Sequence, residues 1–152
     1  MSLKFKKYHT IAYNKTNITQ EKQGLQGSYG IKALESFCIY KSQILQYKAI
    51  ITKILKLHNR HNEQKLKGSY YNSSFLRSHV KTNVFPYNPE TIKSQGSRMG
   101  KGKGAVDDFY FPVKAGRVIF ELINVDLINA QRCLELIKPK IPVHIKLTVV
   151  NY

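Results

Sequence analysis

One short segment holds the residues whose types and spacing best suit a chemical role. It runs Arg98-Met99-Gly100-Lys101-Gly102-Lys103-Gly104, so cations alternate with glycines and no acid interrupts them. Because glycine has no Cβ, the backbone can adopt positive φ values and bring its N–H groups close to a large anionic surface, while the lysines add mobile charge. The pattern predicts contact with phosphate groups, and Lys93 extends the cationic run upstream. The alternative interpretation is a solvated flexible loop.

The charge of the whole chain favours phosphate contact. The 152 residues suit a single domain, 1–152, with its own core. They include 25 Lys and Arg against 9 Asp and Glu, which gives a formal net charge of +16. Such a charge repels itself unless a polyanion neutralises it, and nucleic acid is the first candidate, with an anionic membrane surface the second. A spanning helix is not expected, because no apolar run approaches the ~18 residues that a span needs. A secretory leader is not expected either, because Lys4, Lys6 and Lys7 are followed by a polar stretch, Tyr13 to Gln26, rather than by an apolar core.

The glycine-rich segment does not have the context of a nucleotide-binding loop. Gly100, Gly102 and Ala105 reproduce the spacing of a dinucleotide fingerprint, but that fingerprint opens a helix, and here a β-prone, proline-closed run at 106–112 follows. A Walker loop fails because neither Ser nor Thr follows a Gly-Lys pair. The adjacent acids Asp107-Asp108 would point to opposite faces of a strand. We therefore expect no enzymatic activity, no catalytic residues and no cofactor.

Metal and redox chemistry are not expected either. His58, His61 and His79 lie in one polar region, but no Cys, Asp or Glu completes a convincing ligand set with them. Cys38 and Cys133 stand alone, which predicts two small packing residues and no disulfide.

Two amphipathic helices are predicted. From Tyr40 to His58, apolar residues recur at helical spacing and the lysines fall mostly on the opposite face. Those lysines are either solvated or in contact with phosphates. A second helix begins at Asp126, which can cap it, and ends at about Lys138, before Pro139.

The remaining segments predict strands, a basic arm and an insertion. Residues 1–28 are polar and basic and are predicted to form an extended N-terminal arm, and residues from about 62 to 80 an inserted loop. The run 86–89, Pro-Tyr-Asn-Pro, predicts a turn. The residues Lys114-Ala115-Gly116 predict a hairpin between the two strands they separate. The predicted strands are Val80 to Phe85, Val106 to Val113, Arg117 to Val125 and Val143 to Val149.

The order of these features resembles the bacterial-type L-sixteen family of large-subunit ribosomal proteins. The resemblance covers nearly the whole chain, and the Arg-Met-Gly-Lys-Gly-Lys-Gly string is highly specific to that family. It rests on five segments: Lys4 to His9, Gly27 to Ala33, Val84 to Pro86, Arg98 to Gly104 and Ala115 to Glu121.

The resemblance implies an α+β fold, a two-layer sandwich in which an antiparallel or mixed sheet carries two helices. It implies a structural role in the large ribosomal subunit, bound to rRNA near the central protuberance and beside neighbouring ribosomal proteins, in support of translation and subunit assembly. The glycine-rich segment would reach toward tRNA and the peptidyl-transferase region. The alternative function is a general polyanion-binding or anionic-membrane-surface protein.

Site residues follow from the resemblance together with the helix pattern. The loop near tRNA would consist of Arg98, Met99, Gly100, Lys101, Gly102, Lys103 and Gly104. The rRNA contacts would come from Lys4, Lys6, Lys7, His9, Gly27, Lys32, Lys41, Lys48 and Arg117.

Two features depart from the family pattern. Glu35 to Tyr40 stand where the family has a Gly/Arg-rich stretch, and the insertion at about 62–80 would meet a lineage-specific RNA or protein. The cations are mostly lysines, and Ile, Asn and Tyr are abundant, which is typical of an AT-rich genome. This bias predicts an organelle-encoded member in a mitochondrial ribosome, with a chloroplast ribosome as the alternative.

Overall fold

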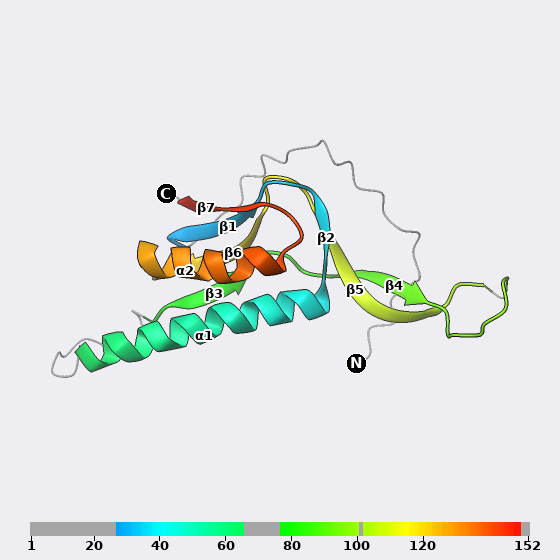
Figure 1. Cartoon of the computed structure of the whole chain (residues 1–152), viewed down its shortest axis with the longest axis horizontal. Helices are drawn as coiled ribbons and strands as arrows, with labels where there is room; N and C mark the ends of the chain where they lie inside the picture. The colour runs from blue at the N-terminus through cyan, green and yellow to red at the C-terminus, as the bar shows by residue number, and fades with distance from the viewer. Residues whose placement is uncertain (1–26, 66–76, 101, 150–152) are drawn as a thin grey trace.

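The computed structural model describes residues 27–65, 77–100 and 102–149. Within these ranges the chain forms seven strands, two α-helices and one short 3₁₀ turn, so the predicted α+β class is confirmed (Figure 1). The helices are α1 (Lys41–Lys65) and α2 (Leu127–Ile137), and η1 (Lys138–Lys140) follows α2. The strands are β1 (Tyr29–Ala33), β2 (Phe37–Tyr40), β3 (His79–Thr82), β4 (Asn88–Ile92), β5 (Ala105–Val113), β6 (Val118–Ile123) and β7 (Ile145–Val149).

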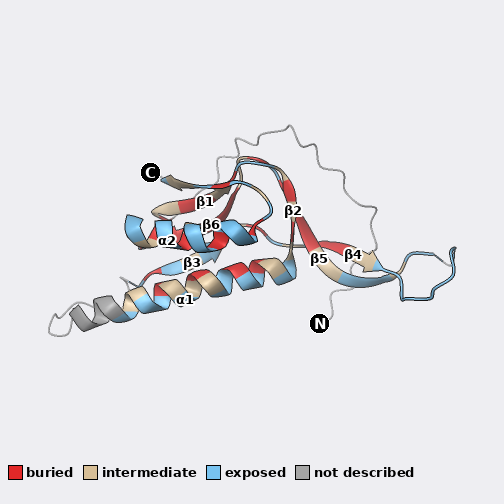
Figure 2. Ribbon diagram, in the orientation of Figure 1, coloured by how far each residue is buried: buried red, intermediate tan, exposed pale blue. Residues whose placement is uncertain are grey.

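The strands divide into two sheets rather than one. The larger sheet has the order β3-β6-β1-β7 and the smaller has the order β2-β5-β4, and all described pairs are antiparallel. Helices α1 and α2 lie side by side against the larger sheet, while the smaller sheet extends beyond them and ends in a long loop (Figure 1). One core joins these layers, and it includes Ile31, Phe120 and Leu122 from the sheet (Figure 2).

Helix α1 packs through the stripe that the sequence predicts. Ile44, Tyr47, Ile51 and Leu55 are at most 6% exposed, whereas the four lysines between residues 41 and 56 are exposed. The Tyr47 hydroxyl donates a hydrogen bond to the Lys140 carbonyl at 2.8 Å, and burial raises its pKa. Helix α1 therefore has one face in the core and one cationic face outside.

Helix α2 agrees closely with its prediction. Ala130, Cys133 and Ile137 are fully buried on one face. Asp126 occupies the N-cap position, but its side chain makes no capping hydrogen bond. Cys38 and Cys133 are both free thiols. Neither described helix has a stretch long and apolar enough to cross a membrane.

The predicted hairpin at Lys114-Ala115-Gly116 is wrong. Gly116 does adopt a positive φ of 90°, but β5 and β6 lie in different sheets and do not pair. Instead β6 pairs with β1 and β5 pairs with β2, so the two long segments form one bent antiparallel ribbon. The Gly116 amide donates to the Ala33 carbonyl at 2.8 Å where both segments bend. The apolar runs on both sides of Gly116 are buried against β1 and β2, which explains why the chain bends here instead of reversing.

Three further boundaries differ from the predictions. At the two ends of the loop predicted from about 62 to 80, α1 continues to Lys65 and β3 begins at His79, and residues 66–76 lie outside the described residues. The predicted turn at 86–89 ends in strand β4, whose Pro89 pairs with Phe109. A proline is tolerated there because β4 is an edge strand and needs fewer amide donors. Strands β1 and β2 were not clearly signalled by the sequence, since each spans only five or four residues.

Candidate nucleic-acid interface

The glycine-rich segment lies in a loop between two paired strands. Strands β4 and β5 pair as far as Ile92 and Ala105, and the β4–β5 loop (residues 93–104) projects from the end of this ladder (Figure 1). Gly104 closes the base of the loop, because a Cβ there would lie 2.3 Å from the Ile92 carbonyl oxygen. Only glycine allows the two strands to approach this closely. The ladder thus holds the loop away from the body of the protein.

The loop itself is open and cationic. Its described residues are exposed except for Gly104, which is half-buried, and Met99 is fully exposed (Figure 2). Gly100 and Gly102 have φ values of 96° and 76°, and no atom lies near the position of an added Cβ. Glycine is therefore required at these positions by the positive φ angle and not by close packing. The Lys93 ammonium donates to the Gly100 carbonyl at 3.0 Å and so ties the two arms of the loop together.

A second cationic surface lies between α1 and the edge strand β3. It is a groove of about 450 Å³ that we call the α1–β3 groove. Among the described residues that line it there is no acidic side chain, so these residues give the groove a positive potential that suits phosphate. It is lined by Lys48, Thr52, Leu55, Lys56, Asn59, Arg60, Arg77, Ser78, His79 and Val80.

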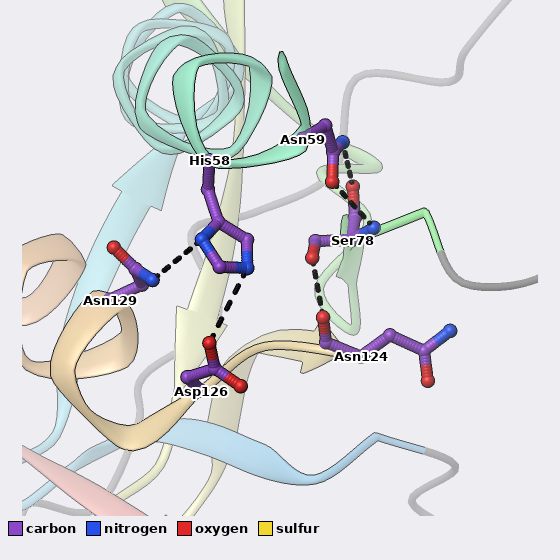
Figure 3. A network of polar contacts seen from close by, with 6 residues as sticks. All are labelled: His58, Asn59, Ser78, Asn124, Asp126 and Asn129. Atoms are coloured by element: carbon purple, nitrogen blue, oxygen red, sulfur yellow. Dashed lines mark hydrogen bonds and ion pairs between the residues drawn. The ribbon is translucent and has the colours of Figure 1, made fainter. Parts of the chain in front are cut away.

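Polar contacts hold the two walls of this groove together (Figure 3). The Asn59 side chain exchanges two hydrogen bonds with the Ser78 backbone, Nδ2 to the carbonyl and the amide to Oδ1, each at 3.0 Å. The Ser78 hydroxyl also donates to the Asn124 carbonyl. Because Ser78 follows Arg77 directly, these bonds fix the point at which Arg77 meets the groove beside Arg60.

His58 has a structural role in the same network (Figure 3). The Asn129 side-chain amide lies 2.8 Å from His58 Nδ1, and the Asp126 carboxylate lies 3.6 Å from Nε2. The Asn129 side chain and the Asp126 carboxylate thus lie against the two different ring nitrogens of His58. His58 thereby joins α1 to the start of α2. Among the residues that the structure describes, no group of three or more His, Cys, Asp or Glu could hold a metal ion.

The outer face of the larger sheet carries further cations. Lys32 on β1 stands opposite Lys146 on β7, and alternation places both on the face away from the helices. On the same face the fully buried Glu121 lies 4.0 Å from the Lys81 ammonium and accepts a hydrogen bond from the Gly27 amide.

Two residues predicted to contact rRNA have evident roles in the fold. Gly27 is buried, and a Cβ there would lie 2.5 Å from the Leu122 carbonyl oxygen, so packing is what requires glycine. The predicted rRNA contact of Gly27 stays a prediction. Arg117 is half-buried, with its guanidinium 4.8 Å from the centre of the Phe111 ring. Stacking of this kind holds the bend between β5 and β6.

The other predicted residues fall into separate groups. Lys41 and Lys48 are exposed on α1, Lys32 lies on the outer sheet face, and the loop residues lie at the far end of the smaller sheet. The sequence pattern missed Arg60 and Arg77, because nothing local indicates that Arg77 returns to α1. Lys4, Lys6, Lys7, His9 and Lys101 lie outside the described residues.

These features define a small basic α+β domain that presents its cations on a projecting loop, a groove and a sheet face. The family model described as Ribosomal protein L16p/L10e matches residues 2–148, and the chain belongs to this family. This assignment confirms the expectation of a non-enzymatic protein.

Curated relatives agree with the family match. The chain is 34% identical to the large ribosomal subunit protein uL16 of Petrotoga mobilis over 121 residues, which cover 80% of this chain and 72% of the relative. It is 34% identical over 123 residues to uL16 of Porphyromonas gingivalis, covering 81% and 72%. It is 32% identical over 137 residues to uL16 of Karelsulcia muelleri, covering 90% and 87%.

Proposed function

We propose that this protein is a structural constituent of the large ribosomal subunit, where it binds large-subunit rRNA near the central protuberance. In this proposal the β4–β5 loop reaches toward tRNA and the peptidyl-transferase region, and the protein supports translation and subunit assembly. The observation that carries the proposal is the loop itself, a cationic segment held out from the fold by a two-stranded ladder. Membership of a ribosomal protein family supports it.

The physical mechanism is the neutralisation of crowded phosphates. Exposed cations release the counterions condensed on RNA, and this release makes the affinity depend strongly on salt. The A-form major groove is too narrow for side chains to read, so contacts should go to phosphates, 2′-hydroxyls and unstacked bases. The glycines of the β4–β5 loop would let backbone N–H groups share this work with Arg98 and Lys103.

The first experiment is sedimentation of the tagged protein with ribosomal subunits. The proposal predicts that the chain migrates with the large subunit, and migration with the free-protein fraction alone would overturn it. In a second experiment, replacing Arg98, Lys101 and Lys103 by alanine should leave the unfolding temperature unchanged, because the described side chains among them are exposed. It should lower the slope of log affinity for large-subunit rRNA against log salt by about 2–3, and reduce tRNA-dependent ribosome function.

A matched control removes the same charge elsewhere. Replacing Lys114, Lys138 and Lys140 by alanine also deletes three exposed cations, none of them in the loop or the groove. If this control lowered tRNA-dependent function as much as the loop variant, net charge rather than the position of the loop would be responsible.

A membrane-surface protein is the second candidate, and one observation favours it. On the basic face of α1, Leu45 and Leu57 are 58% and 60% exposed beside Lys53 and Lys56. Exposed apolar residues among lysines are what an anionic bilayer would bind. Flotation with anionic liposomes tests this, and binding that is lost in a Leu45→Ser, Leu57→Ser variant that still enters ribosomes would establish a second activity.

Composition supports an organellar site of action. Only five of the 25 cationic residues are arginines, and Ile, Asn and Tyr are abundant. This composition is typical of proteins encoded by AT-rich organelle genomes. The proposed location is the mitochondrial ribosome, with the chloroplast ribosome as the alternative. Fractionation of cells that express the chain would decide between them, and recovery in cytosolic ribosomes would contradict both.

A further inference from the structure

An apolar pocket opens on the surface beside the start of α1. It has a volume of about 290 Å³ and lies between α1, the segment that follows β3, and β5. We call it the Phe85 pocket, because the Phe85 ring is 75% exposed there. An exposed aromatic ring contributes little to the core, so its presence on this surface is unexplained by folding. The pocket is lined by Lys41, Ile44, Leu45, Lys48, Thr82, Val84, Phe85, Pro86 and Phe109.

The charge around the pocket is positive. Lys41 and Lys48 line it, and the described part of the chain contributes no acidic residue to its lining. The Lys41 ammonium lies 6.0 Å from the centre of the Phe109 ring, which positions this charge at the pocket wall. The neighbouring Asp108 carboxylate accepts hydrogen bonds from the Ser42 hydroxyl at 3.0 Å and the Phe109 amide at 2.7 Å. Its oxygens are therefore engaged beside the pocket rather than in it.

We propose that the Phe85 pocket binds an unstacked nucleobase, with the flanking phosphates on Lys41 and Lys48. The inference rests on the proposed RNA-binding function and adds a particular ligand class and site to it. Aromatic rings stack on any base, and adjacent cations hold the backbone of the strand. A protein partner fits less well, because lysine is depleted in protein–protein interfaces. The volume of the Phe85 pocket, about 290 Å³, lies near the lower end of the range for ligand pockets and suits a single planar base.

The path of the strand follows from a shared residue. Lys48 lines both the Phe85 pocket and the α1–β3 groove. A single strand lying along α1 can therefore place one base against Phe85 and its following phosphates against Lys56, Arg60 and Arg77. The stacking site and the phosphate-binding groove form one continuous surface.

The test uses the full chain and two short single-stranded RNA probes. The first probe is an oligoadenylate that carries a single 2-aminopurine, whose fluorescence is quenched when it stacks. The second probe has the same length and the same sugar–phosphate backbone but carries no bases. Phe85→Ala and Phe85→Leu should weaken binding of the first probe by roughly 5- to 150-fold and abolish quenching. They should leave binding of the abasic probe and the salt slope unchanged, whereas Phe85→Tyr should behave as wild type.

Two controls separate stacking from charge and from loss of fold. Ile128→Ala removes an apolar side chain of similar exposure, 64%, from α2, and should have no effect on either probe. Lys48→Ala should weaken both probes and lower the salt slope by about 0.7. Unfolding temperatures confirm that each variant is folded.

The outcomes distinguish this inference from the wider proposal. If wild type binds rRNA and the abasic probe but Phe85→Leu loses nothing, no base stacks at this pocket and the inference alone is overturned. If Phe85→Ala binds both probes normally but no longer joins the large subunit, the pocket meets a protein neighbour, which also overturns it. If wild type binds neither rRNA nor probe, the proposed function fails as well.

Discussion

Replacing Glu121 by alanine is expected to destabilise the whole fold. This carboxylate on β6 is fully buried. It accepts a hydrogen bond from the Gly27 amide and another from the Asn83 side-chain amide at 3.3 Å, and it lies 4.0 Å from the Lys81 ammonium. Gly27 lies two residues before β1, so Glu121 anchors the segment that leads into this strand.

The expected magnitude combines gains and losses. A hydrogen bond to a charged group contributes about 1.5–3 kcal/mol, and leaving the buried Gly27 N–H without this acceptor costs about 1–3 kcal/mol. Removal of the carboxylate also relieves the desolvation cost of a buried charge. The Lys81 pair adds little, because its ammonium is distant and the lysine side chain is 44% exposed. We expect a net loss of about 2–4 kcal/mol, or roughly 5–15 °C in unfolding temperature for a chain of this size.

Thermal and urea unfolding followed by circular dichroism measure this loss. Glu135→Ala removes an exposed carboxylate from α2 and should change the free energy of unfolding by less than about 0.5 kcal/mol. Glu121→Gln keeps an acceptor for the Gly27 amide but turns an amide donor toward Asn83. Its free energy of unfolding should therefore lie between those of the Glu121→Ala and Glu135→Ala variants. Equal unfolding temperatures for the Glu121→Ala and Glu135→Ala variants would refute the reasoning.

Two other predictions concern stability and thiol chemistry. Gly104→Ala should cost about 1–3 kcal/mol, because the new Cβ meets the Ile92 backbone at 2.3 Å, whereas Met99→Ala, at a fully exposed position of the same loop, should leave the unfolding temperature unchanged; equal melting of the two variants would contradict this account. Burial raises the pKa of Cys133 from 9.0 to about 11, so its neutral thiol should favour the folded state by roughly 2–3 kcal/mol below pH 9, a contribution lost as the pH rises toward 11. Cys38 is half-buried and should react with a thiol reagent first, and labelling of Cys133 before unfolding would show that its burial is incomplete.

Patterns within one element could be predicted from the sequence. The stripe on α1, the buried face of α2 and the location of the glycine-rich loop between strands all agree with the structure. Each depends on the periodicity of a single helix or strand, or on backbone freedom at a glycine, and these are local properties of the chain. The family resemblance drew on the same local strings.

Strand pairing could not be predicted in this way. The segments on both sides of Gly116 are rich in β-prone residues, and nothing local indicates that they pair with β1 and β2 rather than with each other. The same holds for Pro89, which forms an edge strand only because β5 lies beside it. Pairing depends on which distant apolar surfaces can be buried together.

The sequence by itself determined the charge, the helix faces, the glycine positions and the family. Only the tertiary structure decided which cations share a surface: it brings Arg77 to α1, places Phe85 beside Lys41 and Lys48, and buries Glu121 beneath Gly27. The physical reason is that charge and periodicity are fixed residue by residue, whereas a binding surface forms where packing of the core brings separate segments together.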